Sequence, residues 1–86
     1  MTSARYELTA HAATVIAERG INAAWIERAL TAPERIEPDA FDASLTHALV
    51  RIREREDRVL RVIYNALIDP PRIVTAYFDR RIRGQP

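Results

Sequence analysis

The sequence predicts an α+β domain in which two N-terminal helices pack on one face of a three- to four-stranded antiparallel sheet. Apolar residues recur at helical spacing in the first third of the chain, whereas from Leu45 onwards apolar and polar residues alternate. Short polar or proline-containing turns separate the alternating segments, so consecutive strands can pair as an antiparallel meander. A chain of 86 residues fits a single domain spanning 1–86.

A short extended segment and two helices are expected within residues 5–31. After the extended start at residues 5–8, Thr9 can cap the first helix and Gly20 can end it in a left-handed conformation. Asn22 can cap the second helix, which should run to about residue 31 before a proline.

Two polar residues of the first helix are unusually placed. On a helical wheel Arg19 lies near the middle of the apolar stripe and His11 lies at its edge. An arginine in a core-facing stripe needs a carboxylate, backbone carbonyls or a ligand for its charge. In the second helix Trp25 lies on the apolar face and is expected in the core rather than as a base-stacking residue.

The strands are expected mainly in the second half of the chain. Residues 45–78 should form the meander, with strands over 45–54, 59–68 and 72–78, and the acidic connection before them has room for a short strand at 35–37.

Alternation then assigns the side chains to two faces. We expect the helices to cover Ala48, Val50, Ile52, Leu60, Val62, Tyr64, Ala66, Val74, Ala76 and Phe78. We expect the opposite, half-exposed face to carry His47, Arg51, Arg53, Arg61, Asn65, Thr75 and Tyr77. A half-exposed face with arginines, a histidine and a tyrosine could hold an anion.

Composition restricts the kinds of site. The net charge is +1, but all thirteen basic residues are arginines and most lie in the second half, which predicts a basic C-terminal module. No cysteine and only two histidines are present, so a metal or other cofactor is not expected. No apolar run approaches the roughly 18 residues of a membrane span and no signal peptide is recognisable, so we expect a cytoplasmic protein without membrane contact.

The residue types of the half-exposed face suit cleavage of RNA without a metal. That reaction needs a base for the 2′-hydroxyl, an acid for the leaving oxygen and cations for the charge on the phosphate. Histidine, tyrosine and arginine can fill these roles. The same residues also have structural explanations: arginines on exposed strands guard against aggregation, and a lone histidine or tyrosine can be a packing residue.

Several short motifs together resemble a known family. The segments YELTAHA, ERGI, an RxRxR strand, VLRVIYN and IVTAYFDRR are similar to the bacterial family called domain of unknown function 4258, and more loosely to RelE-like and BrnT-like toxins, over residues 6–81. The resemblance implies a RelE-like endoribonuclease fold, metal-independent RNase activity and recurrent residues at His11, Arg19, Thr75 and Tyr77. The family commonly has a second arginine one turn after the histidine, where this chain has Val15.

These observations lead to the hypothesis of a toxin-like endoribonuclease from a bacterial toxin–antitoxin module. His11 or Tyr77 would transfer protons, and the candidate catalytic set is His11, Arg19, Thr75 and Tyr77. The candidate nucleic-acid-binding residues are Arg51, Arg53, Arg61, His47 and Arg80.

The expected partners are RNA, ribosome-associated mRNA included, and an antitoxin that docks over Arg51, Arg53, Arg61 and Tyr77. The alternative hypothesis is a non-catalytic RNA- or protein-binding module that uses the same basic face. Enzymatic activity itself and the oligomeric state, a homo-oligomer included, are left open.

Overall fold

Both helices begin at the predicted caps in the computed structural model, which describes residues 5–83 and 86. In α1 (Ala10–Glu18) the Thr9 side chain accepts a hydrogen bond of 3.0 Å from the backbone N–H of Ala12. Just beyond the helix, Gly20 adopts a left-handed conformation with φ of 64°, as predicted. In α2 (Ala23–Thr31) the Asn22 side chain accepts from the N–H of Ala24 at 2.8 Å.

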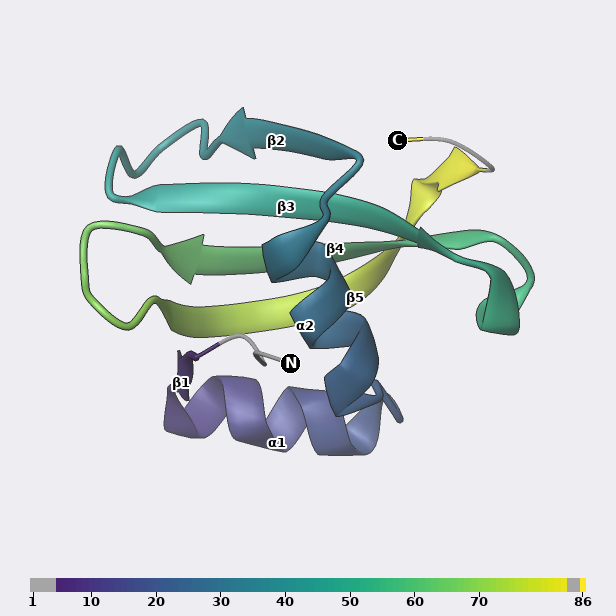
Figure 1. The fold of residues 1–86 in the computed structure, drawn as a ribbon, viewed down its shortest axis with the longest axis horizontal. Helices are drawn as coiled ribbons and strands as arrows, with labels where there is room; N and C mark the ends of the chain where they lie inside the picture. The colour runs from purple at the N-terminus through teal and green to yellow at the C-terminus, as the bar shows by residue number, and fades with distance from the viewer. Residues whose placement is uncertain (1–4, 84–85) are drawn as a thin grey trace.

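The sheet has five strands and mixed pairing (Figure 1), so the predicted three- to four-stranded antiparallel sheet is wrong. Its strands, in the spatial order β1-β5-β4-β3-β2, are β1 (Glu7–Leu8), β5 (Arg72–Arg83), β4 (Arg58–Asn65), β3 (Leu45–Ile52) and β2 (Arg35–Pro38). The short N-terminal segment joins the sheet parallel to β5, whereas all other pairs are antiparallel. Two residues of β1 carry too little pattern to reveal a pairing with a strand more than sixty positions away.

Three strand ends also differ from the prediction. β4 ends at Asn65, three residues before its predicted end at 68. β3 ends at Ile52, and Arg53 begins a 3₁₀ turn, η1 (Arg53–Arg55), that leads into two residues with left-handed backbone. β5 continues to Arg83, five residues past its predicted end.

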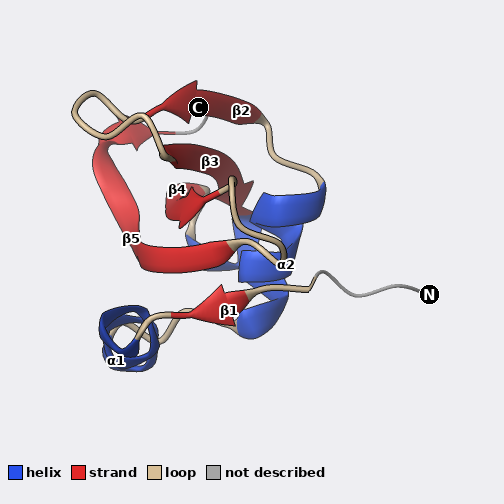
Figure 2. Ribbon diagram, turned by 90° about the vertical axis from the view of Figure 1, so that its left-hand side faces the viewer, coloured by secondary structure: helices blue, strands red, loops and turns tan. Residues whose placement is uncertain are grey.

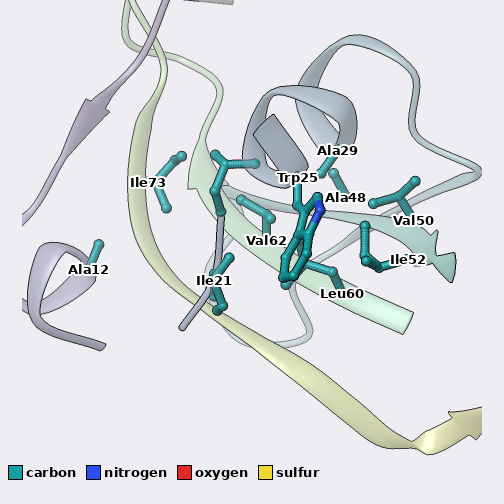
Figure 3. Close-up of a cluster of buried hydrophobic side chains, with 12 residues drawn as sticks. Ala12, Ile21, Trp25, Ala29, Ala48, Val50, Ile52, Leu60, Val62 and Ile73 are labelled. Carbon is teal, nitrogen blue, oxygen red and sulfur yellow. The ribbon is translucent and has the colours of Figure 1, made fainter. Parts of the chain in front are cut away.

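Only α2 lies across a face of the sheet, whereas α1 lies along the edge beside β5 (Figure 1), so the prediction that both helices pack on one face is also wrong. The main core lies between α2 and the sheet (Figure 3). Trp25 of α2 packs among Ile52, Leu60 and other apolar residues of the sheet. Of the side chains predicted on this face, Ala48, Val50, Ile52, Leu60, Val62 and Ala76 are buried in this core and Tyr64 and Phe78 pack against it.

Two predicted residues of the helix-covered face are misplaced. Ala66 lies after the end of β4 and is exposed. Val74 is an extra residue in β5, because Ile63 pairs with Thr75 whereas the next residue of β4 pairs with Ile73. This β-bulge places Ile73, rather than Val74, in the main core.

The centre of the opposite face of the sheet is also buried. Figure 2 shows β5 curving round past β4 and β3 towards β2. On this second face Leu49 and Val59 have no exposed surface, and Arg61 is only 5% exposed. The predicted half-exposed basic face is therefore a second small core with a charged centre. Neither described helix is long and apolar enough to cross a membrane.

Candidate functional site

The helix α1 lies along the outer edge of β5 (Figure 1) and is attached to it near both helix ends. Near its start, the Thr9 hydroxyl donates to the carbonyl of Val74 at 3.4 Å. At its end, Arg19 Nη1 donates to the carbonyl of Ala76 at 2.6 Å. The Ala76 carbonyl is thus the partner that the charge of Arg19 was predicted to need. The two contacts also cover the part of the β5 edge with which β1 does not pair.

The four candidate catalytic residues come from these two adjoining elements. His11 is exposed in the first turn of α1, and Arg19 is exposed at its end apart from its carbonyl contact. Thr75 lies between the two carbonyls that bind α1, and Tyr77 follows the second of them; both side chains are half-buried. We call this arrangement, His11 and Arg19 of α1 beside Thr75 and Tyr77 of β5, the α1/β5 seam. Within the described residues no hydrogen bond joins the four side chains to one another.

A second cluster surrounds Arg61 on the face of the sheet opposite α2, the same face to which Thr75 and Tyr77 belong. Arg61 donates to Glu37 Oε1 at 2.6 Å and, through Nε, to Asp79 Oδ2 at 3.0 Å. Its Nη1 is also 2.8 Å from His47 Nδ1. The Arg61 network comprises Glu37, Asp39, His47, Arg61, Asp79 and Arg81.

The contacts of His47 define its tautomer. Arginine has only donors, so His47 Nδ1 must accept from Arg61 and therefore carries no proton. The proton of the neutral ring is then on Nε2, which donates to Asp39 Oδ1 at 2.7 Å. Both ring nitrogens are used, and His47 acts here as a link between Asp39 of the β2–β3 connection and Arg61 of β4.

Hydrogen bonds lower the pKa of each carboxylate in the network. The bonds from Arg81 are the largest cause that brings the pKa of Asp79 down to about 2, with further contributions from Arg61. Arg61 lowers the pKa of Glu37, and His47 followed by two backbone N–H groups lowers that of Asp39. All three acids are therefore ionised at neutral pH.

The charges of the second face are consequently balanced. Its carboxylates, those of Glu37, Asp39 and Asp79, are matched by the guanidinium groups of Arg35, Arg61 and Arg81. The hydrogen bond with Asp79 raises the pKa of Arg81, and Tyr77 adds to this effect, which places the tyrosine beside the same charges. A cluster with balanced charges and a buried centre, Arg61 and Asp79, does not supply the basic surface that the alternation predicted.

The remaining predicted nucleic-acid-binding residues come from three different elements. Arg51 is half-buried on β3 and already has an interaction partner. Arg53 is exposed on η1 rather than on β3, and Arg80 is exposed on the C-terminal half of β5. Arg53 and Arg80 are thus exposed, whereas Arg61 is buried and His47 is half-buried. No group of three or more acidic or histidine side chains is arranged to hold a metal ion in the described ranges.

Comparison with protein families gives one match, to the family described as Domain of unknown function (DUF4258), over residues 8–78. The chain belongs to this family. The match begins at β1 and ends in the middle of β5, so it includes all four residues of the α1/β5 seam. Comparison with curated proteins and with solved structures finds no significant match.

Sequence reasoning missed most of the Arg61 network in this DUF4258 protein. Asp79 was outside the predicted last strand, although it is the only acidic residue in the segment that forms β5. A single acid in an otherwise basic strand is a signal for a buried partner. Glu37 is the direct cross-strand neighbour of His47, a contact that depends on the register of β2 and was not available from the sequence.

Proposed function

We propose that this DUF4258 protein is a metal-independent endoribonuclease, the toxin-like component of a bacterial toxin–antitoxin module, distantly related to RelE-like and BrnT-like toxins. The observation that supports this proposal is the α1/β5 seam. Short motifs pointed to two residues of α1 and two residues of β5 that are more than fifty positions apart in the sequence. Side-chain hydrogen bonds join these two elements.

The seam offers the groups that RNA cleavage requires. His11 is exposed on a helix whose start is fixed by the Thr9 cap, so its imidazole can exchange a proton with the 2′-hydroxyl or the leaving oxygen. The phenol of Tyr77 can take the complementary role or stack on an unpaired base. Thr75 can donate a hydrogen bond to a phosphate oxygen.

Arg19 is the proposed phosphate-binding residue of the seam. A guanidinium group has five N–H donors, and the hydrogen bond to the Ala76 carbonyl uses Nη1 only. Because Arg19 is exposed, its remaining donors can form the paired hydrogen bonds that arginine makes with phosphate oxygens. The carbonyl contact would hold the group in place beside β5, which reduces the entropy lost when substrate binds.

The direct test is cleavage of RNA by the purified chain in the presence of EDTA. Total RNA and translating ribosomes should both be offered, because the target RNA is not known. We expect His11→Ala to abolish cleavage and Arg19→Ala to reduce it by about a hundredfold or more, the typical effect of removing one group that stabilises transition-state charge.

Matched substitutions test whether these effects are local. Arg28→Ala removes an exposed arginine from α2, and His47→Gln removes the other histidine while keeping a donor and an acceptor in the Arg61 network. Both variants should cleave RNA within a few-fold of the unchanged protein. Equal cleavage by the unchanged protein and His11→Ala would remove His11 from the mechanism.

The alternative, a non-catalytic protein-binding module, is favoured by one observation. Phe41 is 98% exposed in the β2–β3 connection, although Asp39 fixes that connection by accepting hydrogen bonds from the backbone of Phe41 and Asp42. An ordered, fully exposed aromatic side chain is typical of a contact residue in a protein interface. Expression in growing cells separates the alternatives, because an active RNase arrests growth without its partner and a binding module does not.

The proposed antitoxin needs a docking surface different from the one the sequence predicted. Arg61 is too deeply buried to serve as an exposed anchor, since both of its carboxylate partners come from this chain. A partner that inhibits the seam would instead cover α1 and the exposed side of Tyr77.

A further inference from the structure

A cleft of 380 Å³ lies between the β3–β4 connection and the C-terminal half of β5. Its volume is within the range of pockets that bind small ligands. Buried Asp79 forms part of it, but the hydrogen bonds of that carboxylate are made to Arg61 and Arg81. The other lining residues are Glu56, Asp57, Arg58, Phe78, Arg80 and Ile82.

The cleft has unpaired charges of both signs. Glu56 and Asp57 follow η1 with φ values of 58° and 60°, so the chain turns sharply and places two adjacent carboxylates at the cleft. Arg58 and Arg80 contribute two exposed guanidinium groups. In the part of the chain that the structure describes, none of these four side chains has an ion pair or a hydrogen bond. Acceptors and cationic donors are therefore both available to a ligand.

The apolar part of the cleft is a fixed aromatic ring. Phe78 is in edge contact with Trp25, with the ring centroids 6.1 Å apart, and the Arg55 guanidinium lies 5.1 Å from the Phe78 centroid. These contacts hold the ring in one orientation, and because Arg55 lies over one face of it, a ligand can pack only against the part of the ring that Arg55 and Trp25 leave free. A flat ligand can pack its apolar face against Phe78 and Ile82 while its polar edge stays in contact with water.

We propose that this cleft binds one nucleotide of the RNA and selects its base, an inference that rests on the proposed RNase function. The base packs against Phe78, and Arg58 and Arg80 bind the flanking phosphates. The carboxylates of Glu56 and Asp57 accept hydrogen bonds from an exocyclic amino group of the base. Cytosine, adenine and guanine carry such a group, whereas uracil presents a carbonyl oxygen there and is disfavoured.

The position of the cleft agrees with one substrate contacting both sites. Phe78 is two residues beyond Ala76, whose carbonyl holds Arg19, and this spacing along a strand is about 7 Å. An RNA strand with a phosphate on Arg19 therefore needs to extend only a short distance along β5 to place a neighbouring base in the cleft.

Amide NMR on the full chain tests the assignment without depending on cleavage. Cytidine monophosphate, uridine monophosphate and ribose 5-phosphate are each titrated into the isotope-labelled protein. We expect cytidine monophosphate to shift the amides of residues 56–58 and 78–82 and to bind about tenfold more tightly than uridine monophosphate, the discrimination of one well-placed base contact.

Paired variants assign the two kinds of charge. The double variant Glu56→Gln/Asp57→Asn should bring the ratio of the two nucleotide affinities close to one, because amides offer donors as well as acceptors. Asparagine also tolerates the left-handed backbone at this position. Its control, Glu34→Gln/Asp69→Asn, makes the same change of charge away from the cleft and should keep the preference. Arg80→Ala should weaken all three ligands by a similar factor, whereas Arg72→Ala should not.

Two results would overturn the proposal. The first is the absence of shifts at the cleft amides at millimolar nucleotide. The second is equal binding of all three ligands, which would show that the cleft recognises the phosphate and not the base. Either result leaves the His11→Ala cleavage test unaffected. Conversely, base-selective binding by a protein that does not cleave RNA would overturn the RNase proposal while the cleft assignment stands.

Discussion

The two faces of the sheet are built from the same alternating strands, yet they are stabilised in different ways. The helix-covered face is an ordinary apolar core around Trp25 and Leu60, whereas the opposite face surrounds Arg61 with two carboxylates and a histidine. On the first face stability depends mainly on packing. On the second face it depends on whether every charge has its partner, because a buried charge without one is costly.

The largest expected effect breaks the second face. Arg61→Ala leaves Glu37 and Asp79 without their shared cation, and we expect a loss of about 3–5 kcal/mol in the free energy of unfolding. Urea denaturation followed by circular dichroism measures it. In the background Glu37→Gln/Asp79→Asn, replacement of Arg61 by Met should cost far less, because no carboxylate is then left unpaired. A similar large loss in both backgrounds would assign the effect to packing rather than charge.

Acidification should weaken the same face by a smaller amount. The pKa of Asp79 is about 2 in the folded protein, below the value of roughly 4 in an unfolded chain, so protonation favours unfolding. The stabilisation, about 2 kcal/mol, should be fully present above pH 4 and be lost as the pH falls towards 2. Urea midpoints measured from pH 7 down to 2 show this loss, and Asp79→Asn should be less stable at pH 7 with a shallower acid dependence. An unchanged acid profile in that variant would exclude Asp79 as the cause.

The helix-covered face should respond to a change of volume instead. Ile26 is 1% exposed on α2, and Ile26→Val removes one methylene group at a cost of about 1 kcal/mol. Because no titrating group is involved, the difference in unfolding free energy between the variant and the unchanged protein should be constant from pH 7 to 4. A difference that varied with pH would mean that the two faces are coupled through the sheet.

The smallest effect should come from an arginine outside both cores. Arg28 pairs with Glu54 at 3.0 Å, but the two side chains are 38% and 52% exposed. Solvent screens such a pair, so Arg28→Ala should change the free energy of unfolding by no more than about 0.5 kcal/mol in the same urea titration. A loss comparable to that of Arg61→Ala would contradict the importance assigned to burial.

The sequence predicted the local features well because they depend on neighbouring residues. The caps at Thr9 and Asn22 and the left-handed Gly20 involve contacts over two to four positions. The apolar face of β3 and β4 followed from the two-residue period of a strand. The candidate seam followed from short motifs, and the structure places its two elements side by side, while its chemical role stays a prediction.

The errors share a different physical origin. The parallel pairing of β1, the curvature of β5 and the burial of Arg61 all depend on contacts between distant parts of the chain. Alternation assigns a residue to a face but does not say what covers that face. The prediction treated the uncovered face as half-exposed and basic, although the extension of β5 beyond Phe78 supplies a carboxylate for its central arginine.

The extra residue at Val74 also bears on which changes of length the chain tolerates. At most positions of a paired strand, deletion of a single residue turns every following side chain to the other face of the sheet. Deleting Val74 alone would restore regular alternation at this point of the strand, because Ile73 and Thr75 already pair with consecutive residues of β4, although it would remove the carbonyl that accepts from Thr9. Natural relatives that are one residue shorter in this strand should therefore have lost this position, with Tyr77 still beside Arg61 and Ala76 still beneath the helices.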